Sequence, residues 1–140
     1  GVRAFIEFAA ALPMREWSFA PQDNSLATMA GKILPEEERI DWSAPASRIW
    51  GLVRALSPKP VAWTTVRGRR LKVIKASLRD DSSLTGEAHG ELLGLTDGGV
   101  AVASGGGCLV MREVQMEGKK IQTAADWWNG LRAGRGERLI

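Results

Sequence analysis

The stretch VAWTTVRGRRLKVIKASLR, residues 61–79, decides which kind of fold this chain can form. Its first six residues are rich in β-branched and aromatic side chains, which favour β-strands. Arg67 and Gly68 interrupt this run, and apolar residues then alternate with cationic ones between Leu71 and Leu78. Two such runs joined by a short turn predict a β-hairpin.

The second strand of this hairpin contains a slip in its alternation. Its apolar residues form two groups of opposite parity, Leu71 with Val73 and then Ile74 with Ala76 and Leu78. Because a shift by one residue reverses the face of every side chain, a β-bulge near Val73 and Ile74 is needed to turn all five inward. The bulge leaves four cations on the opposite face: Arg70, Lys72, Lys75 and Arg79.

The segments around the hairpin predict a mainly β domain with flanking helices. Residues 43–56 have apolar side chains at helical spacing, with Ser43 as the N-cap and Pro45 in the first turn. Three short strands follow at about 90–96, 100–104 and 108–115, separated by glycine-rich turns. Thr123 and Asp126 resemble a capping box, which predicts a short helix ending near Gly130. Five short strands favour a small closed barrel over an open sheet.

The first forty residues predict two more helices. Apolar residues recur at helical spacing up to Leu12 and again from Leu26 to Ile33. No apolar run approaches the roughly 18 residues that a membrane span needs. A single cysteine, Cys108, and a single histidine, His89, supply neither an internal disulfide nor a metal site. We therefore expect a cytoplasmic protein with no membrane segment and no bound metal.

Charge is distributed unevenly along the chain, although the net charge is only +3. Residues 58–79 carry seven Lys and Arg and no Asp or Glu, whereas residues 80–117 carry one cation and seven acids. Concentrated positive charge of this kind points to a polyanionic partner. The alternative interpretation is a solvated outer face whose cations protect an exposed strand from edge pairing.

Five separated motifs resemble, in order and spacing, the linker and C-terminal domain of the methionyl-tRNA formyltransferase family. They are QDNSLATMAGKI from residue 22, IDWSAPASRIWGLVRALSPKPVAWTT from residue 40, GRRLKV from residue 68, MEGKKIQTAADWWNG from residue 116 and GERL from residue 136. The resemblance implies that residues 1–21 are the terminal helix and exit strand of a catalytic domain. It further implies that residues 22–41 form a linker with a short helix and residues 42–140 an OB-like, tRNA-binding domain.

The resemblance also implies a function for the parent enzyme. That enzyme transfers a formyl group from 10-formyltetrahydrofolate to the amino group of methionine on initiator tRNA. The family's catalytic signature, Asn-x-His-x-Ser-Leu-Leu-Pro, does not occur in this sequence. The chain is therefore predicted to dock the tRNA, to bind no cofactor itself and to be inactive alone. Its expected partners are initiator methionyl-tRNA and the N-terminal catalytic domain. The protein is expected to be a monomer.

The candidate RNA-binding residues come from the hairpin, the EGKK segment at 117–120, the linker and the C-terminal tail. They are Lys32, Arg67, Arg69, Arg70, Lys72, Lys75, Arg79, Lys119, Lys120 and Arg132. Such cations position an RNA backbone without reading its sequence. Plainer interpretations remain open, because Lys32 has i,i+4 spacing to Glu36 for an ion pair and EGKK also suits a flexible loop.

No residue type in the sequence predicts catalysis by this chain. His89 has no nucleophile or orienting partner nearby in the sequence, and Cys108 within CLVM has the character of a buried hydrophobe. Most of the tryptophans, among them Trp50, Trp63 and Trp127, are predicted to lie in the core and not to stack on bases. The alternative function is a structural or interdomain domain of a sugar-nucleotide or folate formyltransferase that binds no RNA.

Overall fold

The computed structural model describes residues 2–11, 21, 23, 25, 31, 33–79, 88–132, 134 and 136–140. The chain divides into two compact units, Gly1–Lys32 and Ile33–Ile140. Helix α1, Val2–Ala11, lies in the first unit and confirms the first predicted helix. The large apolar side chains Val2, Phe5 and Ile6 of α1 are exposed. Most of the predicted helix that ends at Ile33 lies outside the described residues.

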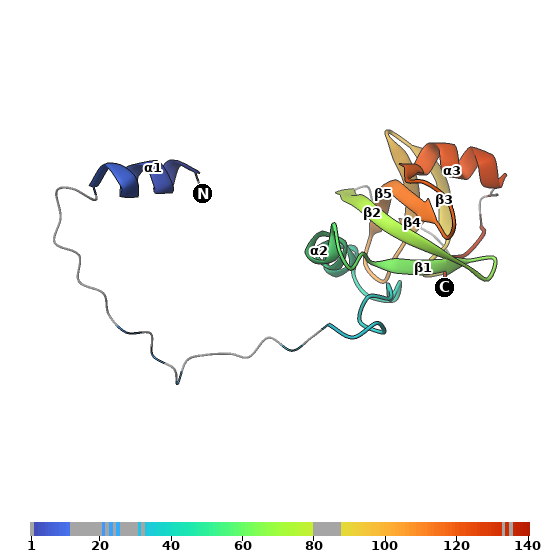
Figure 1. Ribbon diagram of the computed structural model, residues 1–140. Helices are drawn as coiled ribbons and strands as arrows, with labels where there is room; N and C mark the ends of the chain where they lie inside the picture. The colour runs from blue at the N-terminus through green and yellow to red at the C-terminus, as the bar shows by residue number, and fades with distance from the viewer. Residues whose placement is uncertain are drawn as a thin grey trace. The chain divides into compact units, whose positions relative to one another are not determined.

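The second unit is a mainly β domain with two flanking helices, as predicted. Its elements are α2 (Ala46–Leu56), β1 (Trp63–Val66), β2 (Arg69–Arg79), β3 (Leu92–Thr96), β4 (Gly99–Ala103), β5 (Cys108–Met116), β6 (Gln122–Thr123) and α3 (Ala124–Leu131). The antiparallel sheet has the order β1-β2-β5-β4-β3, and β6 pairs with β5 (Figure 1). The predicted hairpin is β1 with β2.

The helices begin for different local reasons. In α3, the Thr123 hydroxyl accepts a hydrogen bond from the Asp126 main-chain amide at 3.0 Å, which confirms the predicted cap. The predicted N-cap of α2, Ser43, is wrong, because Pro45 occupies that position and no side chain caps the helix. The Ser43 hydroxyl instead donates to the Asp41 carboxylate at 2.6 Å, which stabilises the turn before the helix.

The predicted bulge is present in β2, but its effect on side-chain burial is smaller than expected. Val73 pairs with Val114, while Lys75 already pairs with Glu113, so Ile74 falls outside the register. Leu71 and Val73 are fully buried on the core side of the sheet. The expectation that all five apolar side chains turn inward is wrong, because the side chain of Leu78 is 44% exposed. The core packed against this strand ends at Ala76.

A C-terminal segment, residues 136–140, closes the sheet into a ring of main-chain hydrogen bonds. The Leu139 amide donates to the Gly90 carbonyl at 2.8 Å, and the Leu92 amide donates to the Glu137 carbonyl at 2.7 Å. On its other side, Ile140 exchanges two hydrogen bonds of 3.0 and 2.8 Å with Thr65 of β1. The segment therefore joins β3 to β1, and the ring runs through all the strands between them.

One buried hydroxyl connects this closing segment to the core. The Thr64 hydroxyl is fully buried, accepts from the Trp42 indole Nε1 at 3.0 Å and donates to the Ile140 carbonyl at 3.1 Å. The Thr64→Val substitution keeps the shape but leaves the buried indole N–H without its acceptor. We expect it to lower the free energy of unfolding by about 1–3 kcal/mol, measured by urea denaturation.

The neighbouring residue offers a matched control for that substitution. Thr65 is only half-buried, and its hydroxyl donates to the same Ile140 carbonyl at 2.8 Å without accepting from an indole. Thr65→Val should therefore lower the free energy of unfolding by less than Thr64→Val does. Equal losses for the two variants would contradict a structural role for the Trp42 hydrogen bond.

Candidate nucleic-acid interface

Strand β2 carries the cations on a face that points away from the core. Leu71 and Val73 are fully buried, whereas Arg70 is exposed and Lys72 is half-buried between them on the other face. Residues Arg69–Lys72 of β2 pair with β1, and β5 pairs along the other edge of β2. Protection of a free strand edge therefore does not account for Arg70 and Lys72, whereas the pairing with β1 ends before Lys75 and Arg79.

A tryptophan on β1 supports one of these cations. The guanidinium carbon of Arg70 lies over the Trp63 ring, 4.1 Å from its centroid, and that of Arg39 lies 5.8 Å from the same centroid. Trp63 is half-buried and pairs directly with Lys72 across the hairpin. The prediction that Trp63 belongs to the core missed this contact, which depends on a register that no local pattern specifies.

The EGKK turn is attached to β2 and brings further cations beside it. The Glu117 amide donates to the Arg70 carbonyl at 3.0 Å, and the Arg69 guanidinium donates to the Glu117 carbonyl at 3.3 Å. The Gln115 side-chain amide donates to the Lys119 carbonyl at 2.8 Å. Gly118 has a φ of 76°, a conformation that favours glycine. The turn thus holds the exposed Lys119 beside the basic strand.

Two hollows adjoin this face of the sheet, and both are lined by Lys72 and Gln115. The smaller has a volume of about 170 Å³ and is lined by Arg70, Lys72, Gln115, Met116, Glu117 and Gly118. The larger has a volume of about 640 Å³ and is lined by Pro58, Lys59, Pro60, Val61, Lys72, Ile74, Gln115 and Ile121. Lys59 was not among the predicted residues, although it belongs to the acid-free segment 58–79.

Other predicted residues have partners within the domain. The Arg67 guanidinium forms a bidentate ion pair with Glu137, with N–O distances of 2.6 and 2.9 Å. Lys75 lies 3.8 Å from the Glu113 carboxylate, both side chains being largely exposed. The Arg79 guanidinium donates to the Thr96 hydroxyl on β3.

The remaining predicted cations differ in where they lie. Lys120 is exposed at the end of the EGKK turn, and Arg132 is exposed in a left-handed conformation at the end of α3. Lys32 lies outside the described residues. Within the described ranges, the cations that β2 and the turn bring together without an ion pair are Arg69, Arg70, Lys72, Lys119 and Lys120.

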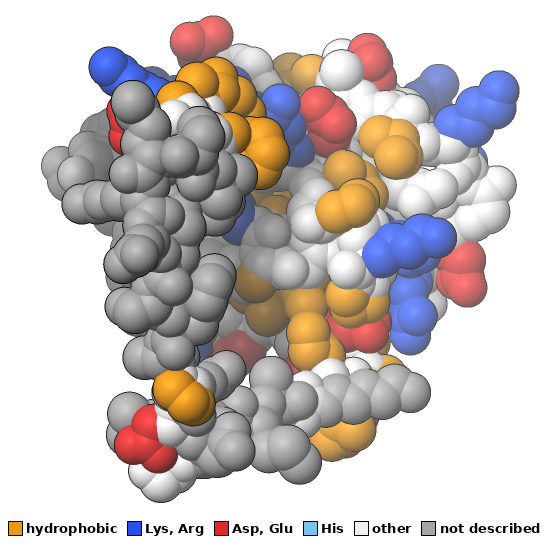
Figure 2. All heavy atoms as spheres, turned by 60° about the vertical axis from the view of Figure 1, so that its left-hand side comes forward, with side chains coloured by type: hydrophobic (Ala, Val, Ile, Leu, Met, Phe, Trp, Pro, Cys, Tyr) orange, Lys and Arg blue, Asp and Glu red, His pale blue; other side chains and the backbone are white. Residues whose placement is uncertain are grey.

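Figure 2 shows how charged side chains are distributed over one face. On the face drawn in Figure 2, Lys and Arg side chains are interspersed with Asp and Glu side chains and with exposed apolar ones. Opposite charges that alternate over a surface cancel at short range and give little attraction for a polyanion.

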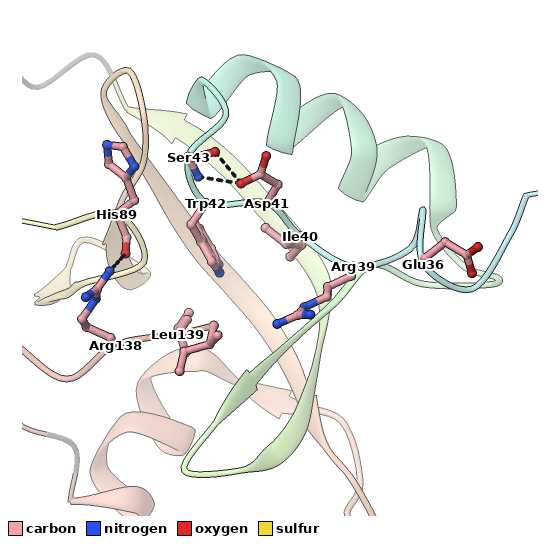
Figure 3. Close-up of a pocket in the computed structure, with 10 residues that line it drawn as sticks. Glu36, Arg39, Ile40, Asp41, Trp42, Ser43, His89, Arg138 and Leu139 are labelled. Carbon is pink, nitrogen blue, oxygen red and sulfur yellow. Dashed lines mark hydrogen bonds between the residues drawn. The ribbon is translucent and has the colours of Figure 1, made fainter.

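A further hollow of about 500 Å³ lies where the closing segment meets the turn before α2. Arg39 and Arg138 lie on opposite sides of it, with Trp42 and Leu139 between them (Figure 3). Two hydrogen bonds from Ser43 hold the pKa of Asp41 below its usual value. Glu36 also lines this hollow. Its charges are of both signs, whereas the described residues that line the larger hollow beside β2 include Lys59 and Lys72 and no acid.

The described part of the chain contains no metal centre or membrane helix. No three His, Cys, Asp or Glu side chains among those residues come close enough to hold a metal ion. No helix in the same residues is both long and apolar enough to cross a bilayer. The His89 carbonyl accepts a hydrogen bond from Arg138 at 3.1 Å, a contact that involves no titrating atom of the imidazole.

Comparison with solved structures shows the same fold in another protein. HypX from Aquifex aeolicus has a TM-score of 0.70 at 21% sequence identity, over 97% of this chain and 24% of that one. One of the matching structures of that protein is its complex with tetrahydrofolic acid.

Comparison with curated proteins finds relatives that share more of the sequence. The methionyl-tRNA formyltransferase of Roseiflexus castenholzii is 45% identical over 85% of this chain and 37% of its own length. That of Chelativorans sp. is 36% identical over 99% of this chain and 44% of its own length. The chain thus spans less than half the length of these relatives.

A family model described as "Formyl transferase, C-terminal domain" matches residues 32–132. The matched range includes α2, the whole six-stranded sheet and α3. The basic face of β2 and the EGKK turn therefore lie within the matched region, and the closing segment 136–140 follows it. The chain belongs to the formyl transferase C-terminal domain family.

Proposed function

We propose that this chain is the tRNA-docking part of a methionyl-tRNA formyltransferase. The relatives that carry this name match it at 36–45% identity over most of its length. The observation on which the proposal depends is the set of cations on β2 and the EGKK turn that form no ion pair in the described residues: Arg69, Arg70, Lys72, Lys119 and Lys120. Cations without carboxylate partners attract phosphate groups.

In this proposal the chain contributes position and not chemistry. A preceding catalytic domain transfers the formyl group from 10-formyltetrahydrofolate to the methionine amino group of the initiator tRNA. The β2 face and the EGKK turn hold the tRNA backbone, so that the aminoacyl end stays within reach of that domain. Residues 1–21 and 22–41 are the end of the catalytic domain and the linker, and the whole protein acts as a cytoplasmic monomer.

Contacts with phosphates have a measurable signature in their dependence on salt. Each phosphate neutralised by Lys or Arg releases condensed counterions, so on the order of four to seven contacts give a slope of several units in log K against log salt. We expect the 140-residue chain to bind methionyl initiator tRNA with roughly micromolar affinity at low salt, and to lose it steeply as salt is raised. Fluorescence anisotropy with labelled tRNA measures both quantities.

The same titration separates this function from the interdomain alternative. Heparin, a polyanion without RNA structure, serves as the comparison ligand. Stronger binding of tRNA than of heparin at matched charge would support RNA docking. An absence of tRNA binding at low salt would favour a structural domain of a sugar-nucleotide or folate formyltransferase.

A further inference from the structure

The smaller hollow beside β2 has the size and the lining of a site for a single phosphate group. Its volume is about 170 Å³, and Arg70 and Lys72 lie on the strand that forms one wall. The opposite wall is the turn at Glu117 and Gly118, which the Glu117–Arg70 main-chain hydrogen bond of 3.0 Å attaches to the strand. Because both walls are held by the same hydrogen-bonded sheet, the distance between them is fixed before a ligand binds.

Arg70 is held in place by an aromatic ring, and it forms no ion pair among the residues that the structure describes. Its guanidinium carbon lies 4.1 Å from the centroid of Trp63, within the range of a cation–π contact. A guanidinium stacked by its face keeps its N–H edge available for two parallel hydrogen bonds to phosphate oxygens. Since the stack already restricts the side chain, less conformational entropy is lost when a phosphate binds.

Lys72 adds a second positive charge to the same hollow. It is half-buried between its cross-strand neighbours Trp63 and Gln115, and it forms no ion pair in the described residues. Among the described residues that line the hollow, the carboxylate is that of Glu117, which forms no ion pair with either cation. In this described lining the cations therefore outnumber the acid two to one.

We propose that Arg70, Lys72 and the Glu117–Gly118 turn form a phosphate-binding notch that holds one phosphodiester of an RNA backbone. Trp63 is its positioning residue, since it acts through Arg70 and does not itself contact the phosphate. The notch fixes one phosphate at a defined place on the basic face. The identification of its ligand as RNA rests on the proposed function. The other cations of the face contribute attraction without a fixed geometry.

The Arg70→Lys substitution tests the notch because it keeps the charge and removes the planar fork. A mixed-sequence RNA duplex titrated at several salt concentrations should bind the variant about three- to tenfold more weakly, with an unchanged salt slope. Arg48→Lys is the control, since Arg48 is an exposed arginine of α2 that belongs neither to β2 nor to the EGKK turn and forms no cation–π contact in the described residues. It should bind within about twofold of the parent chain. Equal affinities for the two variants would overturn the notch and leave RNA docking intact.

Three more variants test the roles given to Trp63 and Glu117. Trp63→Phe keeps an aromatic face under Arg70 and should retain most of the affinity, whereas Trp63→Leu should weaken binding as much as Arg70→Lys does. Glu117→Gln removes the carboxylate from the notch and should strengthen binding by about two- to fivefold. Thermal unfolding of each variant separates a loss of binding from a loss of fold. Equal binding by the Phe and Leu variants, both folded, would contradict the positioning role of Trp63.

A titration with inorganic phosphate tests the notch without RNA. Added phosphate should shift the NMR resonances of the Gly118 amide and the Arg70 Nε in a saturable way, and Arg70→Lys should abolish the shift at Gly118. Small shifts spread evenly over the basic residues would overturn the notch. Should the duplex fail to bind at low salt, the proposed function would fail, and the phosphate titration would still decide whether the notch exists.

Discussion

Deletion of Arg138, Leu139 and Ile140 is expected to unfold most of the Ile33–Ile140 unit. The deletion removes the Leu139 side chain, which is only 2% exposed, and it removes the main-chain hydrogen bonds to Gly90 and Thr65. Loss of a buried leucine side chain costs about 2–5 kcal/mol. Each main-chain group left unpaired adds about 1–3 kcal/mol if it stays buried. The total is comparable with the whole stability of a small domain, roughly 5–15 kcal/mol.

Urea denaturation followed by tryptophan fluorescence measures this loss. The control is Arg138→Ala, which removes only the hydrogen bond of 3.1 Å from an exposed arginine to the His89 carbonyl. That variant should change the free energy of unfolding by less than about 1 kcal/mol. A deletion variant with the denaturation midpoint of the parent chain would show that residues 136–140 do not close the sheet in solution.

Replacing Arg70 and Lys72 together by glutamine is expected to weaken tRNA binding about 50-fold near 0.1 M salt. Each phosphate contact contributes roughly 0.9 to the slope of log K against log salt, and therefore close to one log unit at about 0.1 M. The salt slope should accordingly fall by about two. The expected loss is large because neither cation forms an ion pair within the described residues, so both are free to bind phosphate.

The matched control is the pair Arg67→Gln and Lys75→Gln, which lowers the net charge by the same amount. These cations already contact carboxylates, Arg67 that of Glu137 at 2.6 Å and Lys75 that of Glu113 at 3.8 Å. We expect this variant to lose only about threefold in tRNA affinity, with a salt slope close to that of the parent chain. Equal losses in the two double variants would mean that total charge, and not its placement on β2, governs binding.

The elements that the sequence predicted correctly are those specified by residues near one another in the chain. The hairpin follows from two alternating runs around Arg67 and Gly68, and the bulge follows from the slip between Val73 and Ile74. The cap of α3 needs only Thr123 and a residue three positions later. Each prediction succeeded because the interacting groups lie within a few residues, where backbone geometry leaves few alternatives.

The errors occurred where local patterns compete or where distant packing decides. Ser43 has the chemistry of an N-cap, but the carboxylate of Asp41 two residues earlier takes its hydroxyl. Leu78 has the parity of a buried residue, yet it lies beyond the core that packs against β2 and stays 44% exposed. Periodicity reports which face a side chain occupies, but not whether another element covers that face.

Local patterns in the sequence specify the β1–β2 hairpin, the helices α2 and α3 and the concentration of cations in residues 58–79. Which of those cations form ion pairs depends on contacts that exist only in the folded domain. Arg67 meets Glu137 from 70 positions away, whereas Arg70 lies over the ring of Trp63 and forms no ion pair in the described part of the chain. Each side chain carries its charge whatever the fold. An ion pair, however, needs a carboxylate from a distant part of the chain, and the closed sheet decides which carboxylate lies beside which cation. The same closure pairs residues 136–140 with β1 and β3, although the sequence of this segment does not have the alternation typical of a strand.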